Sequence, residues 1–127
     1  MKTPLHLDTH VIAWLYAGRV DQFSARSRAL LEERPLFISP AVELELGVLY
    51  DQGILRVPAG EIVQDLADRI QLTVSTASFS RVTNKALEFS WATDVFDRLI
   101  CAEAELAEAN LLTKDAGIHA HFSRAFW

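Results

Sequence analysis

The sequence predicts an α/β fold in which helices cover both faces of a central parallel sheet. Short apolar segments alternate along the chain with longer segments of helical periodicity. Such alternation is typical of βα units, in which a helical crossover joins parallel strands. Because the strands run parallel, joined by right-handed crossovers, the carboxyl ends of all strands lie along one edge. The chain has no internal repeat or long linker, and we expect one domain over residues 1–127.

The predicted strands and helices follow one another without long gaps. We expect strands at four apolar segments: Leu5–Leu7, Leu36–Ser39, Leu72–Ser75 and Leu111–Thr113. We expect helices at Thr9–Ala17, Ser24 to about Arg34, Pro40–Gln52, Glu61–Ile70, about Ser80–Phe89 and Val95–Ala109, and a short one that ends near Phe122.

Glycine, proline and small polar residues set the helix boundaries. Gly18 closes the first helix, because glycine readily adopts the left-handed conformation of a helix C-terminus. Ser24 is a suitable N-terminal cap for the second helix, and Pro35 prevents that helix from continuing. Ser39 followed by Pro40 is a strong start signal, with the cap residue first and proline at the first helical position.

Composition and hydropathy exclude several classes of protein. Of the 127 residues, 50% are hydrophobic and 23% charged, an ordinary balance for a globular protein. No apolar run approaches the ~18 residues that cross a membrane, and the first residues lack the apolar core of a signal peptide. We therefore expect a cytoplasmic protein. The single cysteine, Cys101, excludes an intramolecular disulfide and is expected to be a small buried hydrophobe.

Four carboxylates are predicted to meet at the carboxyl edge of the sheet. Asp8 and Asp115 follow strands, while Glu45 and Asp97 lie early in helices that begin at the same edge. Such a cluster repels itself unless protons or cations intervene. The net charge of −5 does not by itself indicate nucleic-acid binding, but an acidic cleft suits Mg²⁺ or Mn²⁺. The residues therefore favour metal-assisted hydrolysis of a phosphodiester bond.

Each acid also has an ordinary structural explanation. Asp8 and Asp115 could simply cap the helices that follow them. Asp94 and Asp97 have the spacing of an N-terminal cap and the third helical position. Glu45 falls within the apolar arc of its helix, where a carboxylate needs a partner, a proton or a metal, and a salt bridge to an arginine would satisfy it.

The remaining polar residues have open roles. Glu103 also falls within the apolar arc of its helix and could support the site, lie in an interface or form a buried ion pair. Arg98 could contact phosphate or neutralise nearby acids. His10 is expected to pack or form hydrogen bonds rather than bind metal, and His119 and His121 are expected at the surface.

Four segments, taken together, resemble the motifs of the PIN-domain nucleases, in particular the VapC-type toxins of bacterial toxin–antitoxin pairs. The segments LDTHVIAWL, ISPAVELELGVL, DVFDRLICAEA and LLTKD occur in the family's order, and the resemblance covers almost the whole chain. It assigns the metal site to Asp8, Glu45, Asp97 and Asp115, with accompanying hydroxyls from Thr9 and Thr113. Asp94 matches a further acid of this subgroup. Val95 departs from the usual proline, and a histidine common before the third motif is absent.

The resemblance implies a three-layer α/β/α sandwich with a central, mostly parallel sheet of four or five strands. It also implies Mg²⁺-dependent RNA cleavage, with Mn²⁺ as a substitute, and a homodimer or a hetero-oligomer with an inhibiting antitoxin. Antitoxins of this kind insert an arginine into the acidic pocket and bind along a hydrophobic groove. The groove candidates, which could equally be core residues, are Trp14, Leu15, Tyr16 and Leu49. Phe126 and Trp127 could pack on the sheet or contact a partner.

Two other functions compete with the toxin endoribonuclease. A catalytically silent PIN-fold module would bind a protein partner, but it would have no reason to keep four mutually repelling acids. A phosphoryl-transfer or receiver-like domain would use a strand-end aspartate with Thr113 and Lys114, yet the sequence lacks the acidic pair such sites have beside Asp8.

Overall fold

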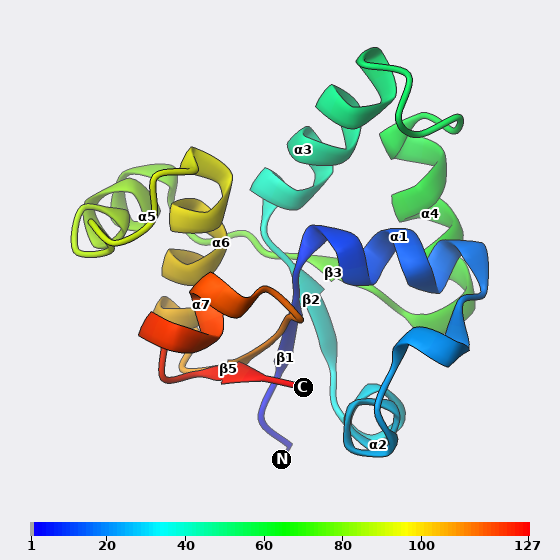
Figure 1. The fold of residues 1–127 in the computed structure, drawn as a ribbon, viewed down its shortest axis with the longest axis horizontal. Helices are drawn as coiled ribbons and strands as arrows, with labels where there is room; N and C mark the ends of the chain where they lie inside the picture. Colours follow the sequence, from blue (N-terminus) through cyan, green and yellow to red (C-terminus); the bar gives the residue numbers. More distant parts are fainter. Residues whose placement is uncertain (1) are drawn as a thin grey trace.

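Five parallel strands form the centre of the structure, a computed structural model that describes residues 2–127 (Figure 1). They are β1 (Leu5–Leu7), β2 (Leu36–Ile38), β3 (Thr73–Val74), β4 (Asn110–Leu112) and β5 (Ala125–Phe126). The strand order is β3-β2-β1-β4-β5, and every neighbouring pair runs parallel. The predicted α/β fold with a parallel sheet is confirmed.

Seven α-helices surround this sheet within residues 2–127. They are α1 (Thr9–Ala17), α2 (Ala25–Glu33), α3 (Pro40–Asp51), α4 (Ala59–Ile70), α5 (Phe79–Ala86), α6 (Val95–Leu106) and α7 (Ala116–His121), with a short 3-10 helix at Val20–Gln22. Helices α1, α2 and α4 lie on one side of the strands and α5 and α6 on the other, while α3 contacts both α4 and α6 (Figure 1). No helix within residues 2–127 has the length and hydrophobicity needed to cross a membrane.

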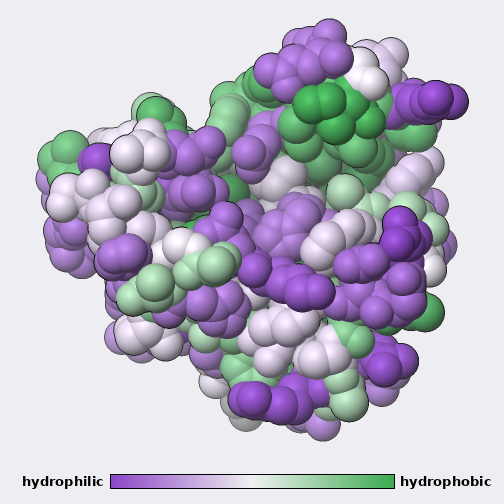
Figure 2. All heavy atoms as spheres, in the orientation of Figure 1, coloured by the Kyte–Doolittle hydropathy of each residue, from purple (hydrophilic) through white to green (hydrophobic). Residues whose placement is uncertain are grey.

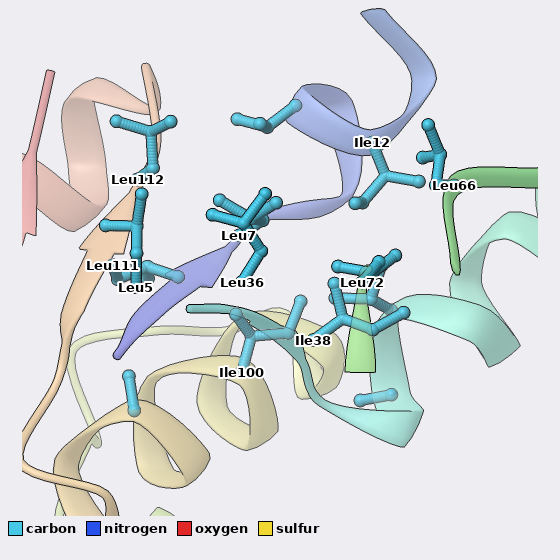
Figure 3. Packing of buried hydrophobic residues seen from close by; sticks show 14 of the residues in the cluster. Leu5, Leu7, Ile12, Leu36, Ile38, Leu66, Leu72, Ile100, Leu111 and Leu112 are labelled. Atoms are coloured by element: carbon cyan, nitrogen blue, oxygen red, sulfur yellow. The ribbon is translucent and has the colours of Figure 1, made fainter. Parts of the chain in front are cut away.

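The core is built on the central strand, whose side chains are buried on both faces. Leu5 and Leu7 of β1 have no exposed surface. Side chains from α1 and α4 cover one face of the sheet, and Ile100 of α6 covers the other (Figure 3). Cys101, next to Ile100, is buried as predicted. A fully buried central strand explains why LHL shows no polar alternation, since parallel sheets have no solvent-facing side.

Most predicted boundaries are confirmed to within two residues, and the larger differences have local causes. Helix α6 ends at Leu106 rather than Ala109, because Glu108 adopts a positive φ of 52° and the Ala109 amide turns back to the Ala104 carbonyl. Helix α5 ends at Ala86, three residues before the expected end at Phe89, because the chain continues in turns in which the Glu88 and Phe89 amides donate to the Lys85 and Ala86 carbonyls.

The terminal residues form a strand that the sequence did not indicate. Ala125 and Phe126 pair with β4 as β5, and Trp127 stacks on Phe23 with ring centres 5.4 Å apart. The Arg26 guanidinium lies over the Phe126 ring, 4.6 Å from its centre. Within this chain, Phe126 is part of the sheet and Trp127 packs on Phe23; contact with a partner stays a prediction.

Glu103 is a buried carboxylate without a basic partner among the described residues. Its side chain is 3% exposed, and its two oxygens accept hydrogen bonds from the Ser39 hydroxyl (2.9 Å) and the Ser75 hydroxyl (2.7 Å). The buried ion pair considered from the sequence is therefore not formed. Because Ser39 follows β2 and Ser75 follows β3, Glu103 fixes α6 to the carboxyl ends of two strands.

We expect Glu103→Ala to lower the free energy of unfolding by about 1–3 kcal/mol, because it leaves two hydroxyl donors without an acceptor. Glu103→Gln keeps one oxygen acceptor and the side-chain shape, so its loss should be smaller. Urea unfolding of both variants measures the difference, with Glu61→Ala on the exposed side of α4 as control. Equal stability of Glu103→Ala and the control would contradict this role.

Candidate active site

An acidic cavity of about 390 Å³ lies at the carboxyl edge of the sheet. All four predicted acids line it, together with the secondary candidate Asp94. The full lining is Asp8, Thr9, His10, Ala13, Glu45, Leu49, Ile54, Leu55, Asp94, Asp97 and Asp115. Neither lysine nor arginine is among these residues, so the cavity is strongly negative.

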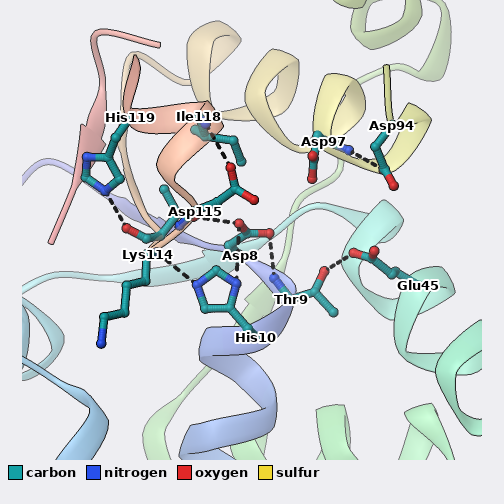
Figure 4. A network of polar contacts seen from close by, with 11 residues as sticks. Asp8, Thr9, His10, Glu45, Asp94, Asp97, Lys114, Asp115, Ile118 and His119 are labelled. Carbon is teal, nitrogen blue, oxygen red and sulfur yellow. Dashed lines mark hydrogen bonds and ion pairs between the residues drawn. The ribbon is translucent and has the colours of Figure 1, made fainter. Parts of the chain in front are cut away.

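Asp8 is at once a helix cap and a strand-end acid. Its backbone leaves β1 and its carboxylate caps α1, where Oδ1 accepts a hydrogen bond from the Thr9 amide at 2.8 Å. The other oxygen, Oδ2, accepts from the Thr113 hydroxyl at 2.7 Å (Figure 4). Asp8 is 4% exposed, so these two donors hold a nearly buried carboxylate in one orientation. The two readings of Asp8 from the sequence are therefore compatible.

Glu45 reaches the cavity from α3 and pairs with a hydroxyl rather than an arginine. The Thr9 hydroxyl donates to Glu45 Oε1, and no Lys or Arg among residues 2–127 forms an ion pair with Glu45 (Figure 4). Burial raises the pKa of Glu45, the charges of Asp8 and Asp94 raise it further, and the Thr9 hydrogen bond partly opposes both. The salt bridge considered as the ordinary explanation for Glu45 is not formed among residues 2–127.

Asp94 and Asp97 stand at the start of α6. Asp94 caps the helix by accepting a hydrogen bond from the Asp97 amide at 3.0 Å. The Asp97 carboxylate is half-buried and points toward the other acids (Figure 4). Burial raises the pKa of Asp97 to about 7, with further contributions from the charges of Asp8, Asp94, Asp115 and Glu45. The folding of distant segments thus brings these acids within range of one another's charge.

Asp115 and Thr113 connect the end of β4 to the same cavity. Asp115 caps α7, where its Oδ1 accepts from the Ile118 amide at 2.9 Å. The buried Thr113 hydroxyl accepts a hydrogen bond from the Asp115 amide at 3.1 Å and donates to Asp8. The Thr113 hydroxyl therefore holds both the Asp8 carboxylate and the backbone amide of Asp115.

The histidines lie as expected, and His10 makes contacts that sequence reasoning missed. His10 Nε2 accepts a hydrogen bond from the Lys114 amide at 2.9 Å, and its Nδ1 faces Asp8 Oδ2 at 3.7 Å (Figure 4). His10 thus bridges the first acid and the turn that carries Asp115. His119 and His121 are exposed.

Arg98 does not neutralise the acids, although that duty was one of its predicted roles. Its Nε donates to the Ala92 carbonyl at 2.7 Å and so fixes the segment before α6. No acidic partner of Arg98 occurs among residues 2–127. A carbonyl partner six residues away could not be recognised in the sequence, because that segment has no regular periodicity.

The donor set suits a hard divalent cation. No group of three or more His, Cys, Asp or Glu side chains within residues 2–127 is arranged to hold a metal ion directly. Mg²⁺, however, usually keeps several of its waters and needs only one or two protein carboxylates. Burial and the neighbouring acids raise the pKa of both Glu45 and Asp97, and no Lys or Arg among residues 2–127 forms an ion pair with either. The residues therefore fit Mg²⁺ or Mn²⁺.

A parallel sheet with acids gathered at its carboxyl edge is the architecture expected of the PIN-domain nucleases, and the comparisons with known proteins bear on that class. A model of the PIN domain family matches residues 5–123. The chain therefore belongs to the PIN domain family. No curated protein matches the sequence.

Solved structures similar to this chain include two VapBC proteins and a toxin–antitoxin complex. VapBC2 from Rickettsia felis, bound to a promoter DNA fragment, is 15% identical with a TM-score of 0.69, and the match covers 97% of this chain and 96% of that one. A toxin–antitoxin complex from Klebsiella pneumoniae is 16% identical, with a TM-score of 0.66 and the same coverage. VapBC-1 from Haemophilus influenzae is 16% identical, with a TM-score of 0.55 and coverage of 95% and 91%. At these identities the likeness concerns the fold.

We expect Asp97→Asn to stabilise the metal-free chain at pH 8 more than at pH 5. The pKa of Asp97 is raised from 3.8 to about 7 in the folded chain. The folded state therefore loses stability as the pH rises from about 4 to about 7, where the half-buried carboxyl group must ionise. Exposure of Asp97 to water reduces the size of the effect. Urea unfolding in EDTA at both pH values measures it, and Asp51→Asn on the exposed end of α3 is the control.

The variant must be compared with the parent at each pH, because the titration of His6 changes the free energy of unfolding in the opposite direction. Burial lowers the pKa of His6 to about 4, which makes the folded chain more stable as the pH rises from 4 to 6.5. His6 is the same in both proteins and cancels in their difference. If the stability difference between Asp97→Asn and the parent does not grow with pH, the pKa of Asp97 is not raised in the folded chain.

Proposed function

We propose that this chain is a metal-dependent endoribonuclease and the toxin of a toxin–antitoxin pair, acting in the cytoplasm as one nuclease domain over residues 1–127. The supporting observation is the convergence of Asp8, Glu45, Asp97 and Asp115 on one cavity of a PIN fold. These acids come from four separate segments. Their mutual repulsion destabilises the folded chain, and a bound cation would offset it. RNA phosphodiester bonds are the proposed substrate.

The four acids hold the ion in this proposal, and Mg²⁺ or Mn²⁺, when bound, activates water and neutralises charge on the scissile phosphate. The chain supplies orientation. The Thr9 amide and Thr113 hydroxyl fix Asp8, and the Thr9 hydroxyl fixes Glu45. Asp94 positions the first turn of α6 and with it Asp97. No side chain is required as a nucleophile, so water is the attacking group.

An antitoxin partner is consistent with the composition of the cavity walls. Leu49, Ile54 and Leu55 form an apolar wall of the acidic cavity, and Ile54 is 65% exposed. Figure 2 shows the corresponding hydrophobic patch over the connection between α3 and α4, beside hydrophilic surface. An apolar segment carrying an arginine would match both walls in shape and charge. The antitoxin is proposed to bind in this way, in a hetero-oligomer or on a toxin homodimer.

We expect Asp8→Asn and Asp97→Asn to abolish Mg²⁺-dependent cleavage of RNA while the fold is retained. Asparagine can still cap α1 at position 8, but it removes the negative charge that binds the ion. Gel analysis of RNA after incubation with each purified variant measures this, with EDTA as metal-free control. Asp51→Asn, outside the cavity, should cleave like the parent.

The alternative function has a clear signature in the same assay. If the parent chain cleaves no RNA with Mg²⁺ or Mn²⁺ and is harmless when expressed, a catalytically silent PIN-fold module that binds a partner is the better description. Retained metal-dependent cleavage by Asp8→Asn would instead contradict the assigned metal site.

We also expect a short neighbouring gene to encode a protein that binds this chain and suppresses its activity. Co-expression should restore growth, and the purified complex should elute as a hetero-oligomer. Ile54→Asp should weaken the complex at least tenfold, because it places a charge on the apolar wall. Val20→Asp, equally exposed but outside the cavity, is the matched control. Identical affinity of both variants would exclude this wall as the binding surface.

A further inference from the structure

A second hollow of about 180 Å³ adjoins the acidic cavity. The two hollows share three lining residues, Asp94, Asp97 and Asp115. The second one is completed by residues from the segment before α6 and from α7: Trp91, Ala92, Thr93, Gly117 and His121. A continuous surface therefore leads from the acids to an aromatic pair, Trp91 and His121.

The aromatic pair forms a fixed platform. The rings of Trp91 and His121 are stacked, with centres 5.1 Å apart and planes inclined by only 9°. Behind Trp91, the Phe89 ring packs edge-on at 6.1 Å and in turn contacts the buried Phe122. His121 is exposed, and its Nδ1 lies 3.0 Å from the Gly117 carbonyl. The platform is thus anchored in the core and ends in a ring open to solvent.

The lining of the two hollows offers RNA no lysine or arginine side chain near the acids. Proteins usually bind single-stranded RNA through basic side chains and through aromatic rings on which bases stack. No lysine or arginine lines either hollow, and the chain carries a net charge of −5. Arg98 donates its Nε to the Ala92 carbonyl, and the Lys114 ammonium lies 5.8 Å from the centre of the Trp127 ring. Stacking on the aromatic pair is therefore the interaction that the lining of the second hollow offers to the substrate.

We propose that Trp91 and His121 form a nucleobase-binding subsite, in which one unpaired base of the RNA stacks against the pair while the adjoining phosphodiester lies at the acids. This inference rests on the proposed ribonuclease function, since it names how that substrate is positioned. It assigns the pair a role in substrate affinity and in the choice of single-stranded RNA. The competing explanation is that the rings only pack the segment before α6 against α7.

Binding can be measured separately from cleavage. The Asp8→Asn chain with Mg²⁺ is titrated into a fluorescently labelled, unstructured oligoribonucleotide of about eight nucleotides, within the range of short single-strand sites. In this background, Trp91→Leu and His121→Ala should each raise Kd about tenfold, the loss expected for one stacked base. Trp91→Phe, which keeps an aromatic face, should stay within about threefold of the parent.

The matched control is Phe79→Leu, which removes an exposed aromatic ring on α5 that lines neither the acidic cavity nor the second hollow. It should leave Kd unchanged. In the cleavage-competent chain, Trp91→Leu should raise KM with little change in kcat, a split that a purely structural role would not produce. The same probe annealed to its complement should bind all variants alike, because its bases are already paired.

The outcomes separate this inference from the proposed function. If Trp91→Leu and Phe79→Leu bind RNA equally, the subsite is excluded even when cleavage is intact. If the parent chain fails to cleave RNA but Trp91→Leu still weakens binding, the nuclease proposal fails and the subsite stands. Should Trp91→Leu not fold, the surface variant His121→Ala decides the question, and an unchanged Kd overturns the inference.

Discussion

The mutual repulsion of carboxylates at one edge of the sheet is the constraint on which this structure depends. Three of the acids, Asp8, Asp94 and Asp115, cap helices, so backbone amides at the helix N-termini offset their charge. Glu45 and Asp97 do not cap helices, and both have raised pKa values. The fold thus offsets the charge of the three capping acids and leaves Glu45 and Asp97 more readily protonated than free carboxylates.

The topology of the sheet explains why the acids meet beside β1. From β1 the chain builds β2 and β3 on one side and later adds β4 and β5 on the other. The connections therefore leave in opposite directions at β1 and β4, and in α/β sheets such a point opens a crevice at the carboxyl ends of the strands. Asp8 follows β1 and Asp115 lies just beyond β4. The aromatic pair next to these acids extends the same crevice.

Local signals carried most of the fold prediction, and long-range contacts account for what it lacked. Ser39 and Pro40 marked the start of α3, and strand-end acids indicated the shared edge, because caps and strand ends are encoded by adjacent residues. The strand β5 has only two residues and exists through its pairing with β4, so no periodicity could reveal it. The serine partners of Glu103 lie 64 and 28 residues away, and nothing in the local sequence announces them.

Thr113 joins the last strand to the first acid. Its amide donates to the Phe126 carbonyl at 3.1 Å, while its hydroxyl donates to Asp8. Residues from the two extremes of the chain therefore meet through a single threonine. During synthesis on the ribosome, Asp8 is made early, but Thr113 gains its full set of hydrogen-bond partners only after residue 126 has been added. The hydrogen bonds that connect Thr113 with Asp8 and with Phe126 are therefore complete only once β5 has joined the sheet.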